Sequence, residues 1–210
     1  MTKFTKDRSV ALSREDAEQF RDVRFSKNPS LVKLDQTEKK LIRSLMRSIP
    51  KGSLVLDVPC GAGRFHEMLT TGGCRLLAAD ISPEMLEVAR SNRLAEDYLL
   101  ADAEKLGVPD KSVDCVFCIR LFHHLGAADT RRRIFKEFAR VSKGWVLVSF
   151  YHSNCLKRFK KLLRGKPLSG EYVSFSALRA EAAEAGLRVV RTSAVARYVL
   201  PQWFVLFAVR

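Results

Sequence analysis

Residues 54–63 are Leu-Val-Leu-Asp-Val-Pro-Cys-Gly-Ala-Gly, and this stretch decides the fold of the chain. Its apolar alternation predicts a buried strand over 54–58, and a loop with Gly61 and Gly63 follows before helix-forming residues begin. A strand, a glycine-containing turn and a helix form the first half of a βα unit. Further units follow along the chain, which predicts a parallel sheet with helices on both faces.

Three successive predicted strands each bring an acid to their carboxyl end. Asp57 closes the first strand, Asp80 follows a strand predicted over 75–79, and Asp102 follows a strand predicted over 97–101. In open α/β sheets, ligands bind outside the carboxyl ends of the strands. We therefore expect the three carboxylates to line one ligand-binding edge.

The acids indicate which ligand binds there. A glycine-rich turn often holds the pyrophosphate of a dinucleotide, but Asp57 would repel it, and Pro59 and His66 interrupt the G-x-G-x-x-G pattern. A cofactor with an ammonium group, a ribose and an adenine fits better. Asp57 can attract the ammonium, Asp80 can accept from the ribose hydroxyls, and Asp102 can accept from the adenine amino group. S-adenosylmethionine has this set of groups. The alternative is a plain Rossmann-like domain whose acids stand at strand ends by chance.

Five stretches also carry a family resemblance, and they are LVLDVPCGAGRF (54–65), AADISPEMLEVAR (78–90), LLADAEKLGVPDKSVDCVF (99–117), RLFHHL (120–125) and EFARVSKGWVLVS (137–149). In their order and spacing they resemble class I S-adenosylmethionine-dependent methyltransferases, of the kind that includes ubiquinone- and menaquinone-biosynthesis enzymes. Many members have glycine where this chain has Pro59. The resemblance spans about 54–149 and fades outside this core, where the substrate is normally chosen.

The resemblance implies a Rossmann-like, doubly wound α/β fold. Its seven-stranded sheet has the order 3-2-1-4-5-7-6, with the last strand antiparallel. It further implies a single methyltransferase domain over 1–210. In that domain a helical cap over 1–50 precedes the cofactor-binding core at 51–150, and a basic helix followed by a helix and two strands completes 151–210.

The cofactor-binding residues follow from the matching positions. The resemblance assigns this role to Asp57, Pro59, Cys60, Gly61, Gly63, Asp80, Ile81, Met85, Asp102, Ala103, Arg120 and Arg24. In this family the amino-terminal helices fold over the cofactor, so Arg24 can pair with its carboxylate in a bidentate manner. The alternative for Arg24 is an ordinary surface arginine.

Apolar periodicity, caps and turn residues predict the remaining elements. Helices are expected over 14–24, 30–48, 63–71, 83–92, 129–142, 155–166 and 176–185, and strands over 113–119, 145–151, 187–196 and 203–209, in addition to the three strands above.

Size and cysteine usage favour a reducing compartment. No apolar run approaches the ~20 residues that cross a bilayer, and residues 1–10 lack a signal-peptide core, so we expect a cytoplasmic protein. Of five cysteines, Cys115 and Cys118 form a C-x-x-C pair within one predicted strand. Side chains three apart on a strand point to opposite faces, so the pair is not expected to chelate a metal or form a disulfide.

The net charge of +14 is unevenly distributed. Residues 51–150 hold 14 basic against 13 acidic residues, whereas 1–50 hold 12 against 7 and 151–210 hold 11 against 3. Residues 155–166 contain six basic residues, no acid and apolar residues at helical spacing. This excess predicts an anionic partner: phosphate groups, anionic lipid on the inner membrane face, anionic glycan or RNA. The alternative is a solvated basic face.

Methyl transfer requires an aligned nucleophile and, for some acceptors, a base. His123 and His124 follow the fourth predicted strand and are the candidate catalytic residues, although a structural role is the alternative for both; His152 is a weaker candidate. The stretch 118–121 lacks the (Asn/Asp/Ser)-Pro-Pro-aromatic loop of enzymes that methylate base amino groups.

Two classes of function stay open at this point. The first is a methyltransferase acting on a small or lipid-linked anionic acceptor, with RNA or protein as the alternative acceptor. The second is a catalytically idle scaffold subunit that binds the cofactor and a partner. The intact set of acids and glycines favours the enzyme.

Overall fold

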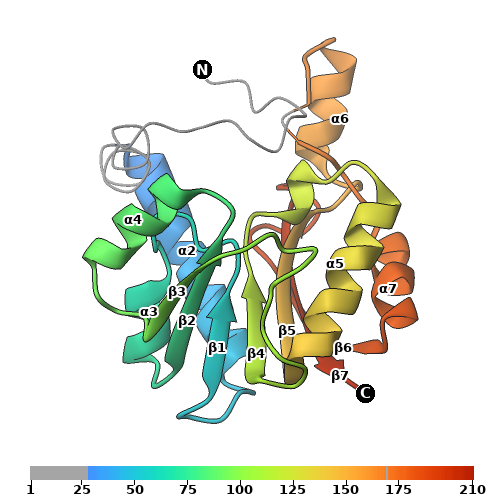
Figure 1. Cartoon of the computed structure of the whole chain (residues 1–210). Coiled ribbons are helices and arrows are strands. Elements are labelled where there is room, and N and C mark those ends of the chain that lie inside the picture. Colours follow the sequence, from blue (N-terminus) through green and yellow to red (C-terminus); the bar gives the residue numbers. More distant parts are fainter. Residues whose placement is uncertain (1–27, 169) are drawn as a thin grey trace.

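The computed structural model of the protein describes residues 28–168 and 170–210. Seven strands form one sheet in the order β3-β2-β1-β4-β5-β7-β6, which confirms the predicted order (Figure 1). The pairs among β1 to β5 are parallel, and β7 is antiparallel to both β5 and β6, as predicted. The helix predicted over 14–24 lies outside the described residues.

The bounds of the elements agree with the predicted ranges to within a few residues. The strands are β1 (Leu54–Asp57), β2 (Arg75–Asp80), β3 (Asp97–Leu100), β4 (Val113–Cys118), β5 (Ser142–Tyr151), β6 (Leu187–Ala194) and β7 (Gln202–Val209). The helices are α2 (Pro29–Met46), α3 (His66–Thr71), α4 (Pro83–Ser91), α5 (Ala128–Val141), α6 (Leu156–Leu163) and α7 (Phe175–Glu184), with the 3-10 turn η1 (Phe122–His124).

Three predicted boundaries were wrong by three residues. The helix expected from residue 63 begins at His66, because Gly61 and Gly63 have positive φ angles of 53° and 78° and keep the chain in turns. The strand expected from residue 145 begins at Ser142, where its pairing with β4 contains an irregular register. The helix expected to end at residue 166 ends at Leu163, and Gly165, with a positive φ of 58°, follows. The other predicted ends shift by one or two residues, within the normal fraying of helix and strand ends.

Local chemistry explains where several helices begin. Asn28 caps α2 by accepting from the N–H of Ser30 at 3.0 Å, and a proline occupies the first turn. Ser82 caps α4 by accepting from the N–H of Met85 at 3.3 Å, again with a proline in the first turn. Ser174 caps α7.

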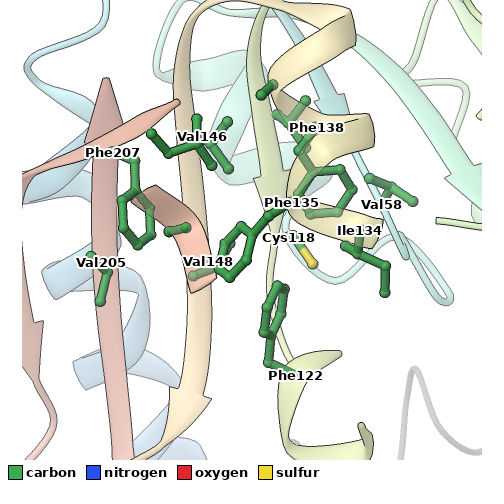
Figure 2. Close-up of a cluster of buried hydrophobic side chains, with 14 of the residues drawn as sticks. Val58, Cys118, Phe122, Ile134, Phe135, Phe138, Val146, Val148, Val205 and Phe207 are labelled. Carbon is green, nitrogen blue, oxygen red and sulfur yellow. The ribbon is translucent and has the colours of Figure 1, made fainter. Parts of the chain in front are cut away.

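Helices cover both faces of the sheet and bury a core on each. On one face, Phe135 and Phe138 of α5 pack against Val146 and Phe207 of β5 and β7 (Figure 2). On the other face, α2 and α3 pack against β1, β4 and β7. Cys115 belongs to the second core and Cys118 to the first, so the C-x-x-C pair is divided between the two faces, as predicted. All five cysteines are free thiols.

The parallel strands β1 to β5 all end at one edge of the sheet, which lies at the top of Figure 1. The glycine loop, η1 and α6 follow the ends of β1, β4 and β5 at this edge. None of the helices in the described part of the chain has the length and hydropathy that a membrane crossing requires.

Candidate cofactor and acceptor site

Asp80 connects the glycine loop to the neighbouring strand. Its side chain is 6% exposed at the end of β2, where Oδ2 accepts from the N–H of Gly61 at 2.8 Å and Oδ1 accepts from the N–H of Ser82 at 3.0 Å. A carboxylate oxygen has two lone pairs, so each oxygen can accept a second hydrogen bond from a ligand. Asp80 is therefore held in place by the backbone and still able to bind two hydroxyl groups.

The two glycines of the loop have different reasons to lack a side chain. A Cβ on Gly63 would lie 2.8 Å from Nδ1 of His66, so the loop can only close over this imidazole with glycine there. A Cβ on Gly61 would meet nothing within 4 Å, which leaves space above the loop. The bond before Pro59 is cis, and the N–H of Cys60 donates to Ala79 at 2.8 Å, which joins the loop to β2.

Asp57 is a buried carboxylate without a hydrogen-bond donor at one oxygen. It is 1% exposed, and its Oδ2 accepts no hydrogen bond from any described residue. Nε2 of His66, itself fully buried, lies 3.5 Å from this oxygen. Burial, with a smaller contribution from Asp80, raises the pKa of Asp57 well above its usual range. Burial lowers the pKa of His66 to about 4, so the imidazole is neutral at pH 7 and supplies no cation. Within the described residues no cation pairs with this carboxylate, so a cationic group of a ligand would fit beside it.

The other predicted cofactor residues surround this centre. Ile81 follows Asp80 and exposes 48% of its surface, whereas Met85, in the first turn of α4, is buried. Asp102 and the half-buried Ala103 follow the end of β3, and Oδ1 of Asp102 accepts from the N–H of Glu104 at 2.9 Å. The structure thus brings the acids of β1, β2 and β3 to one edge of adjacent parallel strands, as predicted.

Arg120 follows β4 at this edge and contacts α2. Its backbone has a positive φ of 70°, its N–H donates to Oγ of Ser149 at 2.8 Å, and its Nη1 lies 3.5 Å from Oε1 of Glu38. Nη2 of Arg64, in the glycine loop, donates to Oε2 of the same Glu38 at 2.7 Å, and its Nε donates to Asp35 at 2.8 Å. Arg24 lies outside the described residues.

This ionic network was not predicted from the sequence, although a signal for it exists. Glu38 is 1% exposed and stands within the apolar stripe of α2, on the same helix face as Ile42 and Leu45. A buried acid at such a position requires a basic partner. The pattern did not indicate which arginines supply it, because both partners are distant in sequence.

The two candidate catalytic histidines differ in exposure. His123 is 4% exposed, and its ring stacks on Tyr151 with a centroid distance of 4.3 Å. Its carbonyl accepts from the N–H of Glu171 at 2.8 Å, and a Cβ on Gly170 would lie 2.9 Å from that oxygen. His124 is exposed, with its ring 4.1 Å from that of His123.

His152 is enclosed by protein. It is 7% exposed, its Nδ1 accepts from the N–H of Asn154 at 2.9 Å, and its ring stacks on Trp203 at 4.8 Å. Burial lowers its pKa. These contacts favour a structural role. Within the described residues, no cluster of three or more His, Cys, Asp or Glu side chains is suited to a metal ion.

Comparison with known proteins matches the same part of the chain. Residues 56–148 match a family model described as a methyltransferase domain. A malonyl-[acyl-carrier protein] O-methyltransferase from Yersinia pestis is 37% identical over 102 residues, which cover 47% of this chain and 36% of that protein. A tRNA (carboxymethyluridine(34)-5-O)-methyltransferase from Arabidopsis thaliana is 27% identical over 159 residues, which cover 75% of this chain and 35% of that protein.

A solved structure extends the likeness to almost the whole chain. The magnesium protoporphyrin IX methyltransferase of Synechocystis PCC 6803 with bound SAH has a TM-score of 0.73 and covers 92% of this chain and 98% of its own, at 16% identity. At this identity the likeness concerns the fold alone. The chain matches about a third of the length of the two curated relatives above.

Residues 56–148 therefore form a methyltransferase domain, as the resemblance to class I S-adenosylmethionine-dependent methyltransferases predicted. Its cofactor is S-adenosylmethionine, and the residues at the sheet edge fit that molecule. Oδ2 of Asp57 lacks a donor that an ammonium group can supply, Asp80 retains acceptor capacity for two hydroxyls, and the space above Gly61 admits a ligand close to the backbone.

Proposed function

We propose that this chain transfers the methyl group of S-adenosylmethionine to a small or lipid-linked anionic acceptor. One observation carries the choice of acceptor. Residues 155–166 hold six lysines and arginines and no acid, and they follow directly on the carboxyl end of β5, at the same sheet edge as the cofactor residues (Figure 1). A positive field at the mouth of a site raises the local concentration of an anionic substrate.

In this proposal each of the three acids binds a different group of the cofactor. Asp57 binds the ammonium group, Asp80 accepts from the ribose hydroxyls, and Asp102 accepts from the adenine amino group. Ile81 packs on the adenine, and Arg120 and Arg24 face the carboxylate. The bound cofactor supplies a methyl group on a sulfonium, which is already activated, so the protein mainly has to align the acceptor.

We assign different roles to the two histidines of η1. His124 is exposed and can take a proton from an acceptor hydroxyl or amine, since imidazole titrates near neutrality. His123 is enclosed by Tyr151 and the backbone at 170–171, so it acts as a positioning residue that fixes η1 under the acceptor. A His124→Asn variant should lower kcat without changing the affinity for the cofactor, whereas a variant with unchanged kcat would remove the base from the proposal.

RNA is the second candidate acceptor, and one observation favours it. The match to the Arabidopsis tRNA methyltransferase extends over 75% of this chain, beyond the methyltransferase core that the Yersinia relative covers. The acceptor of that protein is a carboxymethyluridine, which is itself anionic before methylation. The basic segment 155–166 is therefore compatible with both candidate acceptors, a small or lipid-linked anion and RNA.

Two measurements test the proposal in order. Calorimetry with S-adenosylmethionine tests the pocket: Asp80→Ala should weaken binding by about 1.5–3 kcal/mol, as for hydrogen bonds to a charged group. Asp97→Ala, an exposed acid at the opposite end of β3, should bind normally. Equal affinity of Asp80→Ala and wild type would contradict the assignment.

The acceptor is then identified with a labelled donor. Cell extract incubated with the protein and methyl-labelled S-adenosylmethionine is separated into lipid, RNA, protein and small-molecule fractions. Label in the lipid or small-molecule fraction supports the proposal, and label in RNA supports the second candidate. Tight cofactor binding without label in any fraction would identify an idle scaffold.

A further inference from the structure

Helix α6 is unusual in this fold because none of its residues is buried. It projects from the carboxyl edge of the sheet, away from the body of the domain (Figure 1). Its four apolar side chains are exposed to solvent: Leu156 by 49%, Phe159 by 60%, Leu162 by 51% and Leu163 by 71%. Exposed large apolar residues that gather on one short element indicate a binding surface.

The apolar and basic residues of α6 occupy opposite sides of the helix. Successive residues are rotated by about 100°, so the four apolar side chains fall within roughly one third of the circumference. The basic side chains occupy the opposite arc, and Arg164 and Lys166 continue the charge beyond the helix; the basic residues within it are Lys157, Arg158, Lys160 and Lys161.

The loop between β6 and β7 extends the apolar side. The N–H of Leu156 donates to the carbonyl of Tyr198 at 2.8 Å, and the N–H of Lys157 donates to the carbonyl of Val199 at 3.2 Å. Tyr198 and Val199 are themselves 51% and 48% exposed. A cavity of about 350 Å³ lies between the helix and this loop, lined by Leu156, Phe159, Leu162 and Tyr198 among others. We call α6 with residues 197–200 the α6 surface.

We propose that the α6 surface binds an anionic membrane surface, with α6 lying in the plane of the lipid headgroups. An occupant of this surface has to meet an apolar face and a basic face on opposite sides of one thin helix. A lipid monolayer does so, because acyl chains receive the apolar side while phosphates surround the basic side chains, which reach back to the headgroups. RNA would contact the basic side and leave the four apolar residues in water. A folded protein would cover one side.

This inference goes beyond the proposed function and does not depend on it, because membrane binding needs neither donor nor acceptor. It has one consequence for that function. The α6 surface lies at the same edge of the sheet as the candidate acceptor residues, so a membrane-bound protein would present its acceptor site to the lipid. A lipid-linked acceptor could then be methylated without leaving the bilayer.

Vesicle sedimentation with the full chain tests the proposal. The protein should bind vesicles that contain phosphatidylglycerol and phosphatidylcholine, and bind at least tenfold more weakly to vesicles of phosphatidylcholine alone. Added salt should weaken the binding, since it screens the charges. Phe159→Ser with Leu163→Ser, and separately Lys157→Glu with Lys160→Glu and Lys161→Glu, should each reduce binding at least tenfold.

A matched control changes the net charge by the same amount at residues outside the α6 surface. Lys136→Glu, Arg179→Glu and Arg188→Glu reverse three exposed basic residues on α5, α7 and β6 and should leave vesicle binding within twofold of wild type. Cofactor affinity should stay at the wild-type value in all variants, which shows that they are folded. In a Phe159→Trp variant, lipids with brominated acyl chains should quench the fluorescence of the new tryptophan. The total quenching should exceed that of the wild-type protein, which has only the two native tryptophans.

Several outcomes would overturn the proposal. Wild-type protein that fails to bind anionic vesicles excludes a membrane partner. Full binding by the Phe159 and Leu163 variant, or equal loss in the control variant, would show attraction by net charge without insertion. If that variant instead converts a dimer to a monomer in analytical ultracentrifugation, the occupant of the α6 surface is a second copy of the chain. If vesicles bind only after removal of residues 1–27, that segment is the occupant.

Discussion

At the scale of single residues, Asp57 shows a conflict between cofactor binding and the stability of the folded protein. Its carboxylate is buried, and Oδ2 has no donor among the described residues. The folded protein therefore disfavours the charged form, which is also the form that would bind an ammonium group.

We predict that Asp57→Asn stabilises the free protein and abolishes cofactor binding. At neutral pH the amide removes the need to bury a charge, so the free energy of unfolding should rise by about 1–3 kcal/mol, the usual cost of an unsatisfied buried polar group. Thermal unfolding and calorimetry with S-adenosylmethionine measure the two effects. The exposed control Asp97→Asn should change neither. An Asp57→Asn variant that is less stable than wild type would show that the carboxylate already has a partner.

The same carboxylate predicts a pH dependence of cofactor binding. Its pKa is raised in the free protein, and a bound ammonium group favours the ionised form, so binding releases a proton. Affinity should therefore be full above the raised pKa and fall as the pH drops through it, at pH values above the ordinary carboxyl range. Calorimetry in buffers of different ionisation enthalpy detects the released proton, and no release at any pH would contradict the assignment.

His66 predicts a loss of stability in mild acid. The folded protein lowers its pKa to about 4, whereas an unfolded chain takes up this proton near its ordinary pKa of about 6.5. The stabilisation is complete above about pH 6.5 and is lost as the pH falls toward about 4, by up to about 3 kcal/mol. Denaturant titrations should show a smaller loss in His66→Leu. Asp57 opposes this trend, because protonation of its carboxyl favours the folded state. The comparison of the two proteins separates the effects.

At the scale of elements, the ion pairs of Glu38 join α2 to the sheet edge. This one carboxylate contacts Arg64 in the glycine loop and Arg120 after β4, so it connects the helix, the loop and the end of the strand.

We predict that Glu38→Gln weakens both the fold and the cofactor site. The amide keeps the shape but removes the charge that balances two arginines, which should cost about 3–5 kcal/mol of unfolding free energy, as when one partner of a buried ion pair is removed. Glu67→Gln, an exposed acid on α3, is the control and should be neutral. Chemical denaturation and cofactor calorimetry measure both effects. Wild-type stability in Glu38→Gln would mean that solvent and Asp35, and not Glu38, balance the arginines.

Elements were predictable where their cause is local. Apolar periodicity, the proline and asparagine or serine at helix starts, and acids after strands gave α2, α4 and the three strand ends close to their observed bounds. The start of α3 was misplaced because helix propensity alone does not register two glycines with positive φ. The sheet order came from the family resemblance, since no local pattern specifies which strands are neighbours.

Within the candidate site, only the placement of the three acids at one edge of the sheet was predictable from the sequence. Asp57, Asp80 and Asp102 follow strands, so their position depends on the sheet alone. The surroundings of His123 depend on the backbone at 170–171, nearly fifty residues away, and nothing near either segment indicates the contact. The basic character of α6 was evident from the sequence, but the absence of any buried residue in it was not.

At the scale of the whole molecule, the cofactor-binding core and the segments that flank it differ in net charge. The core of 51–150 is nearly neutral, and most of the excess positive charge lies in the segments that flank it. The donor carries little net charge, whereas the proposed acceptor is anionic. Ionic strength should therefore act on one substrate and not on the other.

We predict that KM for the acceptor rises steeply with salt while the Kd for S-adenosylmethionine stays constant. Charge screening weakens long-range attraction between the basic segment and an anion, but not short contacts inside a buried pocket. Reversing Lys157, Lys160 and Lys161 to Glu should raise the acceptor KM and remove most of its salt dependence. Initial rates at several salt concentrations provide the measurement. A parallel change in both constants would point to a general effect on the fold.

The place of β7 in the sheet has a consequence for biosynthesis. Gln202–Val209 pairs with β5 on one side and β6 on the other, so β6 has no partner until this last strand has been made. While the ribosome translates the intervening residues, β5 presents an open edge in a segment that includes Val146, Val148 and Phe150. An mRNA truncated before the codon for Gln202 would thus yield a chain in which β1 to β5 can pair but the edge of β5 stays unpaired. Such an aggregation-prone chain would be a substrate for chaperones and proteases. Translation through Val209 closes the sheet, and residues 198–199, whose carbonyls accept hydrogen bonds from the start of α6, are made just before it.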